Sequence, residues 1–331
     1  MYLLPLEPKQ DPNYSCLEDL IFSICEWKGE DHRFAFIDCW GFEYNENAKG
    51  TMRLAQRIGT GNVKWRTYLK EYSGIEISMW KHDINSNDFI NFAKRTIVEN
   101  EMPIIIAIDQ DWCPWNSEFF IKFPGGQGGL PHTCLIIGYK DNNFLCIDPL
   151  FSEKVEELPF EYVLKGYGGY MLINYSGQKS KSTLNQQEFL KYISSKILEG
   201  KIPELIRRFS KEFINLNLSI ESQGFEKKPG LSPIVYKLKL IGMGRFKIGI
   251  LLDKINEEKN NKEYGVLSEQ FRDIAKIWYK LSLNVMKMFY SKNKEKLQLS
   301  CVKLLDDIAN KEHHLANRLL SLVKDEDIEV I

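Results

Sequence analysis

The spacing of apolar residues changes along this 331-residue chain, and that change constrains its fold more than any other feature. Before residue 177, short apolar runs of strand type alternate with segments of helical period. Residues 177–183 (GQKSKST) are polar and follow neither period, which is typical of a linker. Beyond them the period is helical almost throughout. The sequence therefore predicts two domains, residues 1–178 and residues 184–331.

The first domain is expected to be of the α+β class, with an antiparallel sheet. A capping-box pattern, Ser15 followed three residues later by Glu18, precedes an apolar stripe and predicts a helix over residues 16–27. Two apolar runs flank the turn-forming letters KDNN and predict a hairpin of residues 132–139 and 144–148. The remaining expected elements are a helix over residues 86–99 and strands over residues 34–39, 103–109 and 169–175.

The second domain is expected to be a helix bundle. Three apolar stripes recur there at helical spacing, and such stripes are typical of helices that face a common core. The stripes comprise Ile202, Leu205, Ile206, Phe209 and Phe213; then Leu267, Phe271, Ile274, Trp278, Leu281, Val285 and Met288; then Leu305, Ile308, Leu315, Leu319 and Leu322.

Charge and cysteine usage exclude several classes of protein. The formal net charge is -1, so no basic surface for nucleic acid or anionic lipid is expected. No stretch reaches the roughly 18 consecutive apolar residues that span a bilayer, and the first ten residues lack a signal-peptide pattern. The seven cysteines form no C-x-x-C pair, which favours free thiols over a disulfide framework or a metal site. We expect a cytoplasmic protein without a metal ion.

Cys16 is the cysteine whose position suggests chemistry. It stands in the first turn of the helix expected over residues 16–27, where free backbone N–H groups and the helix dipole stabilise a thiolate. The thiolate is the nucleophilic form of cysteine. A small apolar residue at a helix start is the alternative, so the choice depends on partners.

His132 is the best candidate for a base beside Cys16. Among the five histidines, it alone opens an apolar strand directly after a glycine-rich stretch, PGGQGG at residues 124–129. A strand can hold such a side chain rigidly at the edge of a cleft. A hydrogen-bonded histidine of the core is the alternative. The other four histidines lie in charged or helical segments: His32, His82, His313 and His314.

Two further polar residues could complete the group. Asp148 ends the second strand of the expected hairpin, at the end where His132 begins the first, and could orient the imidazole. The alternative is an aspartate that starts a turn before Pro149. Gln10 lies six residues before Cys16, and its amide could join the Cys16 N–H in an oxyanion hole.

The order and spacing of Gln10, Cys16, His132 and Asp148 resemble those of the papain-like clan, with the short His-to-Asp interval of C39-type peptidases. The chain most resembles the butirosin biosynthesis protein H family and its N-terminal domain family. The segments that carry this resemblance are SCLEDLIFSICEWKG, FIDCWGFEY, IDQDWCPWN, the His–Gly–Tyr–Asp-Pro stretch and FRDIAKIWYKL. The resemblance implies a papain-like fold for the first domain and maps no catalytic motif onto the second.

The resemblance also implies acyl transfer through a Cys-linked acyl-enzyme, in antibiotic or other specialised-metabolite biosynthesis. The implied donor is a thioester on the phosphopantetheine of an acyl or peptidyl carrier protein, the acceptor is a small amine, and no cofactor is implied. Trp112 and Trp115 could wall the acyl or pantetheine channel, or form an apolar cluster under a loop. A cysteine peptidase or amidase, and a non-catalytic carrier-binding scaffold, remain alternatives, and a homodimer is left open.

Overall fold

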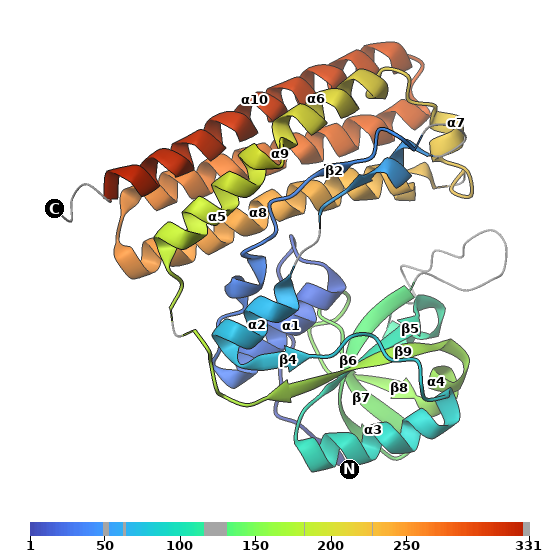
Figure 1. Ribbon diagram of the computed structural model, residues 1–331. Coiled ribbons are helices and arrows are strands. Elements are labelled where there is room, and N and C mark those ends of the chain that lie inside the picture. Colours follow the sequence, from blue (N-terminus) through green and yellow to red (C-terminus); the bar gives the residue numbers. More distant parts are fainter. Residues whose placement is uncertain (49–52, 62–63, 116–130, 182, 227, 327–331) are drawn as a thin grey trace. The chain divides into compact units, whose positions relative to one another are not determined.

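The chain forms two compact units in the computed structural model (Figure 1). The structure describes residues 1–48, 53–61, 64–115, 131–181, 183–226 and 228–326. The first unit comprises Met1–Phe34 and Arg66–Ser182, and the second comprises Ala35–Trp65 and Thr183–Ile331. The sequence-based division placed residues 35–65 in the first domain, and the structure assigns them to the helical unit instead.

The first unit is built on a seven-stranded sheet whose strand pairings are antiparallel. The strand order is β4-β9-β5-β6-β7-β8, and β1 pairs with β6. Its strands are β1 Tyr2–Leu3, β4 Ile75–Ile77, β5 Ile104–Asp109, β6 Pro131–Lys140, β7 Asn143–Ile147, β8 Glu156–Pro159 and β9 Tyr167–Tyr175. The expected strands at 103–109 and 169–175 and the hairpin are present, so the α+β class is confirmed.

Helices pack on this sheet and bury its apolar side chains. They are α1 Cys16–Lys28, α2 Trp65–Ser73, α3 Ser86–Asn100 and α4 Phe160–Gly166. Both α1 and α3 contact β6, and Figure 1 shows α3 below the strands and α1 and α2 to the left of β5 and β6. Leu20 and Ile24 of α1 and Phe89 of α3 are fully buried, which places the core between helices and strands. The helices expected over residues 16–27 and 86–99 are thus present.

The prediction of a strand over residues 34–39 is wrong. His32–Phe36 form a short 3₁₀ helix instead. A half-buried strand alternates buried and exposed side chains, whereas residues 34–37 are all buried. A short apolar run carries no period that separates a strand from another buried segment, and here tertiary packing determined the outcome.

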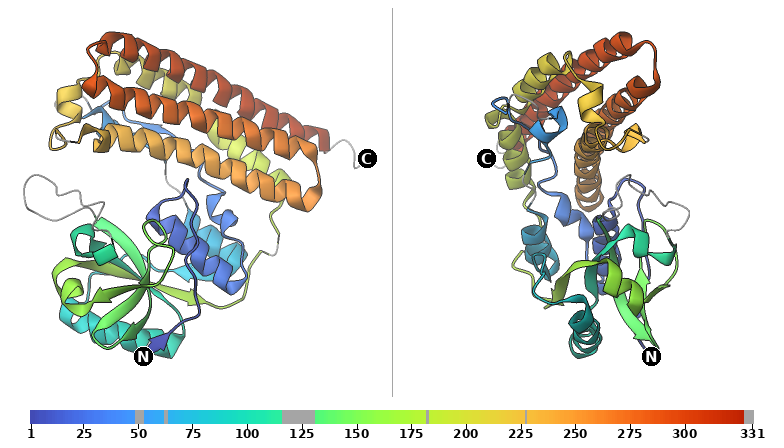
Figure 2. Two further views of the ribbon diagram at one scale, coloured as in Figure 1. Left: turned by 180° about the vertical axis from the view of Figure 1, so that it is seen from behind. Right: turned by 90° about the vertical axis from the view of Figure 1, so that its right-hand side faces the viewer.

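The second unit consists mainly of helices. They are α5 Gln186–Glu199, α6 Ile202–Phe213, α7 Leu218–Glu221, α8 Pro233–Lys259, α9 Lys262–Tyr290 and α10 Lys294–Glu326. The three apolar stripes of the sequence fall on α6, α9 and α10. Figure 2 shows α8, α9 and α10 side by side, and both α8 and α10 pack on α9. Among the described residues, no helix combines the length and apolar character that crossing a membrane requires.

Helix α8 approaches α9 closely because small residues line their contact. A Cβ atom on Gly242 would lie 2.9 Å from the Cβ of Trp278, and one on Gly249 would lie 3.1 Å from the Ser268 carbonyl oxygen. Only glycine fits at Gly242 without displacing its neighbour. The two glycines of the GMG letters at residues 242–244 therefore allow close packing on α8: Gly242 faces α9, and Gly244 faces the backbone carbonyl of Cys39.

The segment of residues 35–65 belongs to the helical unit because its aromatic rings pack there. It carries the small hairpin of β2 (Glu43–Tyr44) and β3 (Ile58–Gly59) and a 3₁₀ helix at Leu54–Arg57. The ring pairs that join it to the helices, with their centroid distances, are Trp40–Phe271 at 4.6 Å, Phe42–Phe209 at 5.8 Å, Phe42–Trp278 at 5.8 Å and Tyr44–Phe209 at 5.6 Å.

A buried carboxylate, Glu312 on α10, ties this segment to three helices. Its Oε2 accepts a hydrogen bond from Trp40 Nε1 at 3.0 Å, and its Oε1 accepts from Trp278 Nε1 at 3.2 Å and from Arg245 Nε at 2.8 Å. Arg245 Nη1 donates to the Gly41 carbonyl. Glu312 and Arg245 are 0% exposed, so each charge depends on the other for solvation.

The substitution Glu312→Ala should therefore destabilise the helical unit by about 3–5 kcal/mol, because it leaves Arg245 buried without a counter-charge. Chemical denaturation, followed by tryptophan fluorescence, measures the change. Glu204→Ala is the matched control, since Glu204 faces Arg207 across 3.7 Å on an exposed surface and should cost less than about 1 kcal/mol. Equal losses for the two variants would contradict the structural role of Glu312.

Candidate active site

Helix α1 begins at Cys16, and its first turn is fixed by the residues before it. The Ser15 backbone N–H and hydroxyl both donate to Glu18 Oε2, at 2.8 Å and 2.9 Å. This is half of the capping box that the sequence predicted, and it holds the start of the helix in place. Cys16 is half-buried. Because it is the first residue of α1, its thiol stands at the positive end of the helix dipole.

The structure brings His132 and Asp148 together. His132 stands at the start of β6, and Asp148 follows the end of β7. The two strands pair with Leu135 opposite Ile147, which places both side chains at the same end of the hairpin. His132 Nε2 lies 2.7 Å from Asp148 Oδ2, and both residues are buried, at 4% and 0% exposure. This pair is the one that the sequence suggested.

Asp148 serves both of the roles that the sequence left open. Its backbone carbonyl accepts hydrogen bonds from the N–H groups of Phe151 and Ser152 and so starts a turn. Its side chain holds His132. The Phe151 ring lies 5.1 Å from the imidazole, between ring centroids, and covers part of it.

Trp115 contacts Asp148, although the sequence predicts a channel wall or an apolar cluster for it. Its Nε1 donates to Asp148 Oδ2 at 2.7 Å, so one carboxylate oxygen receives both the indole and the imidazole. Hydrogen bonds to a charged group are among the strong ones, and two of them leave Asp148 little freedom to turn. The expected channel role of Trp115 stays a prediction.

The side chains of Cys16 and His132 interact, and each shifts the pKa of the other. Burial raises the pKa of Cys16, but His132 and, to a lesser degree, Thr133 lower it by more, so the net shift is downward. Burial lowers the pKa of His132, but Asp148 and Cys16 together raise it to about 9. Because Asp148 occupies Nε2, the ring nitrogen that remains for Cys16 is Nδ1. The arrangement favours a thiolate beside an imidazolium.

In other cysteines of the chain, the pKa of the thiol is raised rather than lowered. Burial raises the pKa of the thiols of Cys25, Cys113 and Cys301, to about 12 for Cys301. The pKa of Cys134 is raised by its hydrogen bond with Cys146 and by burial. A buried thiol with a raised pKa is inert at neutral pH, so Cys16 is the candidate nucleophile.

Gln10 lies in the segment that precedes α1, between two residues whose backbones the helix holds. The Lys9 N–H donates to Ser23 Oγ at 2.9 Å, and the Asp11 N–H donates to Asp19 Oδ1 at 3.0 Å. The Gln10 side chain is exposed. Its part in an oxyanion hole stays a prediction.

Trp112 points to a different neighbourhood from Trp115. Its ring lies 5.6 Å from that of Tyr162 on α4, between centroids, and its Cδ1 fills the space over Gly166, where a Cβ would lie only 2.6 Å away. Trp112 thus anchors α4 to the segment after β5. Its expected role in an acyl channel is not tested by these contacts.

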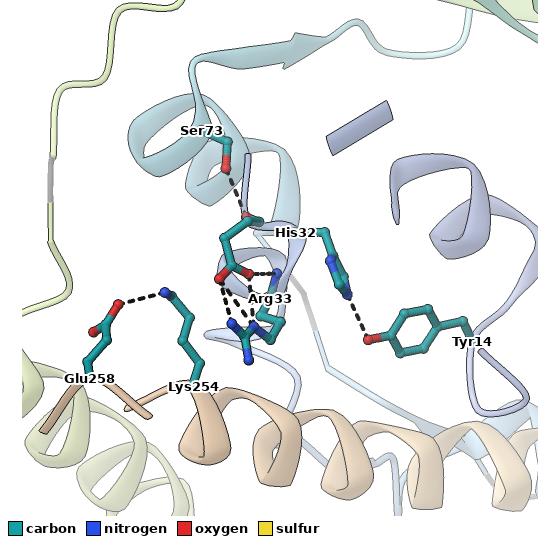
Figure 3. A network of polar contacts seen from close by, with 7 residues as sticks. Tyr14, His32, Arg33, Ser73, Lys254 and Glu258 are labelled. Atoms are coloured by element: carbon teal, nitrogen blue, oxygen red, sulfur yellow. Dashed lines mark hydrogen bonds and ion pairs between the residues drawn. The ribbon is translucent and has the colours of Figure 1, made fainter. Parts of the chain in front are cut away.

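The other histidines have separate surroundings. His32 Nε2 lies 2.9 Å from Tyr14 Oη (Figure 3), and burial lowers the pKa of His32 to about 4, so the two side chains share a hydrogen bond in which the His32 ring is neutral. This contact holds the turn just before Cys16. His313 and His314 are exposed on α10, as their pattern indicated. Among the described residues, no group of three His, Cys, Asp or Glu side chains is arranged to hold a metal ion.

No protein-family model matches the chain, and no curated protein matches its sequence. The residues 116–130 between Trp115 and β6, which include the glycine-rich stretch, lie outside the described part of the chain.

Cys16 should be the thiol that reacts first, and its reactivity should persist below the pH at which ordinary thiols ionise. Alkylation by iodoacetamide follows the thiolate fraction, so its rate against pH should give an apparent pKa below the usual value of about 8.5. His132→Ala should move that pKa upward, because burial then acts without a counter-charge. Peptide mapping by mass spectrometry identifies the labelled residue. An unchanged pKa in His132→Ala would contradict the pairing.

Trp115→Phe should slow alkylation of Cys16 at neutral pH by roughly threefold to tenfold, a part of the value of one charge-assisted hydrogen bond. The loss follows because Asp148 then holds His132 less firmly and the thiolate fraction falls. Trp112→Phe is the matched control, since its ring contacts α4 rather than Asp148, and its rate should match the wild type. Equal rates in both variants would show that the indole does not support Asp148.

Proposed function

We propose that this chain is a cysteine-dependent acyltransferase of papain-like fold, with Cys16 as nucleophile, His132 as base and Asp148 as the residue that orients the base. One observation carries the proposal. A thiol at a helix start has its pKa lowered by a neighbouring imidazole, and a buried carboxylate holds that imidazole through its Nε2 atom. A nucleophile, a base and an orienting group are the three parts that acyl transfer through a covalent intermediate requires.

The first step uses the thiolate. Cys16 Sγ attacks the thioester carbonyl carbon, the bond from that carbon to the donor sulfur breaks, and the donor leaves as a thiolate that takes a proton from the His132 imidazolium. Negative charge on the carbonyl oxygen is stabilised by the Cys16 backbone N–H and, in this proposal, by the Gln10 amide. The product of the step is an acyl group on Cys16.

The second step uses the neutral imidazole. His132, having given up its proton, accepts one from the incoming amine as the amine attacks the acyl-enzyme, and Cys16 leaves as a thiolate beside the restored imidazolium. We propose a carrier protein as the source of the thioester and a small amine as the acceptor, with no cofactor of the protein's own. All seven cysteines are free, which suits action in a reducing compartment such as the cytoplasm.

A cysteine peptidase or amidase is the second candidate, and one observation favours it. The pKa of His132 is raised to about 9, so the ring carries the proton that a poor amine leaving group needs. Hydrolysis would then follow when water replaces the amine in the second step.

Incubation with acyl-carrier thioesters should add one acyl mass to the protein, and Cys16→Ala should abolish the adduct. Intact mass spectrometry measures it. Cys301→Ala is the matched control, since its thiol is buried in the helical unit. Acylation should follow a bell-shaped pH profile, because it needs the thiolate and the imidazolium together and the imidazolium loses its proton as the pH rises through about 9.

The acceptor then separates the candidates. Release of the acyl group onto an added primary amine, faster than onto water, supports a transferase. Peptide cleavage without acyl transfer to amines supports a hydrolase. A protein that shows neither activity, and whose Cys16 resists iodoacetamide when folded, would instead be a non-catalytic carrier-binding scaffold.

A further inference from the structure

The segment from Lys9 to Asp11 is held along the side of α1 at two points. Asp19 Oδ1 accepts the Asp11 N–H at 3.0 Å, and Ser23 Oγ accepts the Lys9 N–H at 2.9 Å. Asp19 and Ser23 are four residues apart on one helix and so share a face. The segment therefore runs antiparallel to α1, toward the end at which Cys16 stands.

Gln10 lies between these two points. Its backbone is fixed on both sides, since the N–H groups of the residues before and after it are bound to α1. Its side chain is exposed, and among the described residues it makes no hydrogen bond. The position of the Gln10 backbone, and so the region that its amide can reach, is thus set by its neighbours, chiefly through the Asp11 N–H, the contact nearer to Cys16.

Asp19 is a costly residue to keep at this position. It is 0% exposed, and within the described residues its Oδ2 has no hydrogen-bond partner. Burial is the main reason that its pKa is raised to about 7; the Asp11 N–H opposes the rise, and the nearby acids Glu18, Asp11 and Asp148 add to it. A buried carboxyl with one unsatisfied oxygen costs free energy. In the part of the chain that the structure describes, the one hydrogen bond of the Asp19 side chain goes to the Gln10 segment.

We propose that Asp19 is a positioning residue for acyl transfer: by fixing the backbone of Asp11, it places the Gln10 amide where its N–H can donate to the oxyanion that forms when Cys16 attacks a carbonyl. This inference rests on the proposed function and adds to it. Ser23 supports the same segment from the Lys9 side.

Two reagents separate this role from a general effect on the site. With p-nitrophenyl acetate, Cys16 Sγ bonds to the carbonyl carbon, an oxyanion forms, and p-nitrophenolate leaves with the electron pair of the broken C–O bond. With iodoacetamide, the thiolate displaces iodide from a saturated carbon, and no oxyanion forms. The first rate reports the oxyanion hole together with the thiolate, and the second reports the thiolate alone.

Asp19→Ala should slow acylation by p-nitrophenyl acetate at least about tenfold, because the loss of one oxyanion-hole donor costs that much or more. The same variant should change the rate of alkylation by iodoacetamide less than about twofold. Asp19→Asn should restore most of the acylation rate, because its side-chain carbonyl can still accept the Asp11 N–H. Gln10→Ala should show the same split between the reagents. The Asp19→Ala/Gln10→Ala double variant should be no slower than Gln10→Ala, since Asp19 acts through Gln10.

Glu26→Ala is the matched control, an exposed acid on the same helix, and both of its rates should match the wild type. Three outcomes would overturn the inference: wild-type acylation in Asp19→Ala, equal slowing with both reagents, or effects of Asp19→Ala and Gln10→Ala that multiply in the double variant. The first and third leave Cys16 an acylated nucleophile and the proposed function intact. If the wild type is alkylated but never acylated at Cys16, the proposed function fails, and this inference fails with it.

Discussion

The hydrogen bond between His132 Nε2 and Asp148 Oδ2 is the contact on which the candidate site depends. Both side chains are buried, so water does not compete for either group and the bond is worth more than it would be at the surface. It fixes the ring, leaves Nδ1 for Cys16 and helps to keep the imidazole protonated. Without it, burial would dominate the ionisation of Cys16, and the thiol would resemble the other buried cysteines of the chain.

Neighbouring elements converge on this contact. Trp115 donates to the same carboxylate oxygen, Phe151 covers the imidazole, and the capped start of α1 presents the thiol. Together with His132 and Asp148, these groups come from four places in the sequence, near residues 16, 115, 132 and 148–151, that the sheet and α1 bring together. The rigidity of the site thus comes from β6, β7 and α1, rather than from the segment around Gln10, which is held by two hydrogen bonds to one helix.

The parts of the structure that sequence could predict are those with a local period or a local turn. The hairpin of β6 and β7 was predictable because two apolar runs flank a short polar turn, and from it followed the proximity of His132 and Asp148. Contacts over long separations leave no such trace. Nothing near Trp115 indicates that its indole reaches a residue 33 positions away, and nothing near Glu312 indicates Arg245, 67 positions before it. Helix α8 shows no single stripe because many of its sides are buried.

The same limit explains why the apolar run of residues 34–39 predicts a strand where the structure has a 3₁₀ helix at His32–Phe36. These side chains are buried on all sides against partners far along the chain, and such burial does not alternate. Segments of this kind are best recognised by what covers them, which one sequence does not reveal.

The path of the chain has a consequence for how the protein can be made and divided. Since Ala35–Trp65 interrupts the first unit and belongs to the second, neither unit is one continuous stretch of the gene. On the ribosome, Trp40 emerges long before Glu312, its partner 272 positions later, so this segment must wait for the last helix before its rings are covered. A gene fragment that encodes only the residues after the linker would yield the helices without Ala35–Trp65, the segment that packs on them. A permuted gene that joins the two pieces of the second unit would supply it.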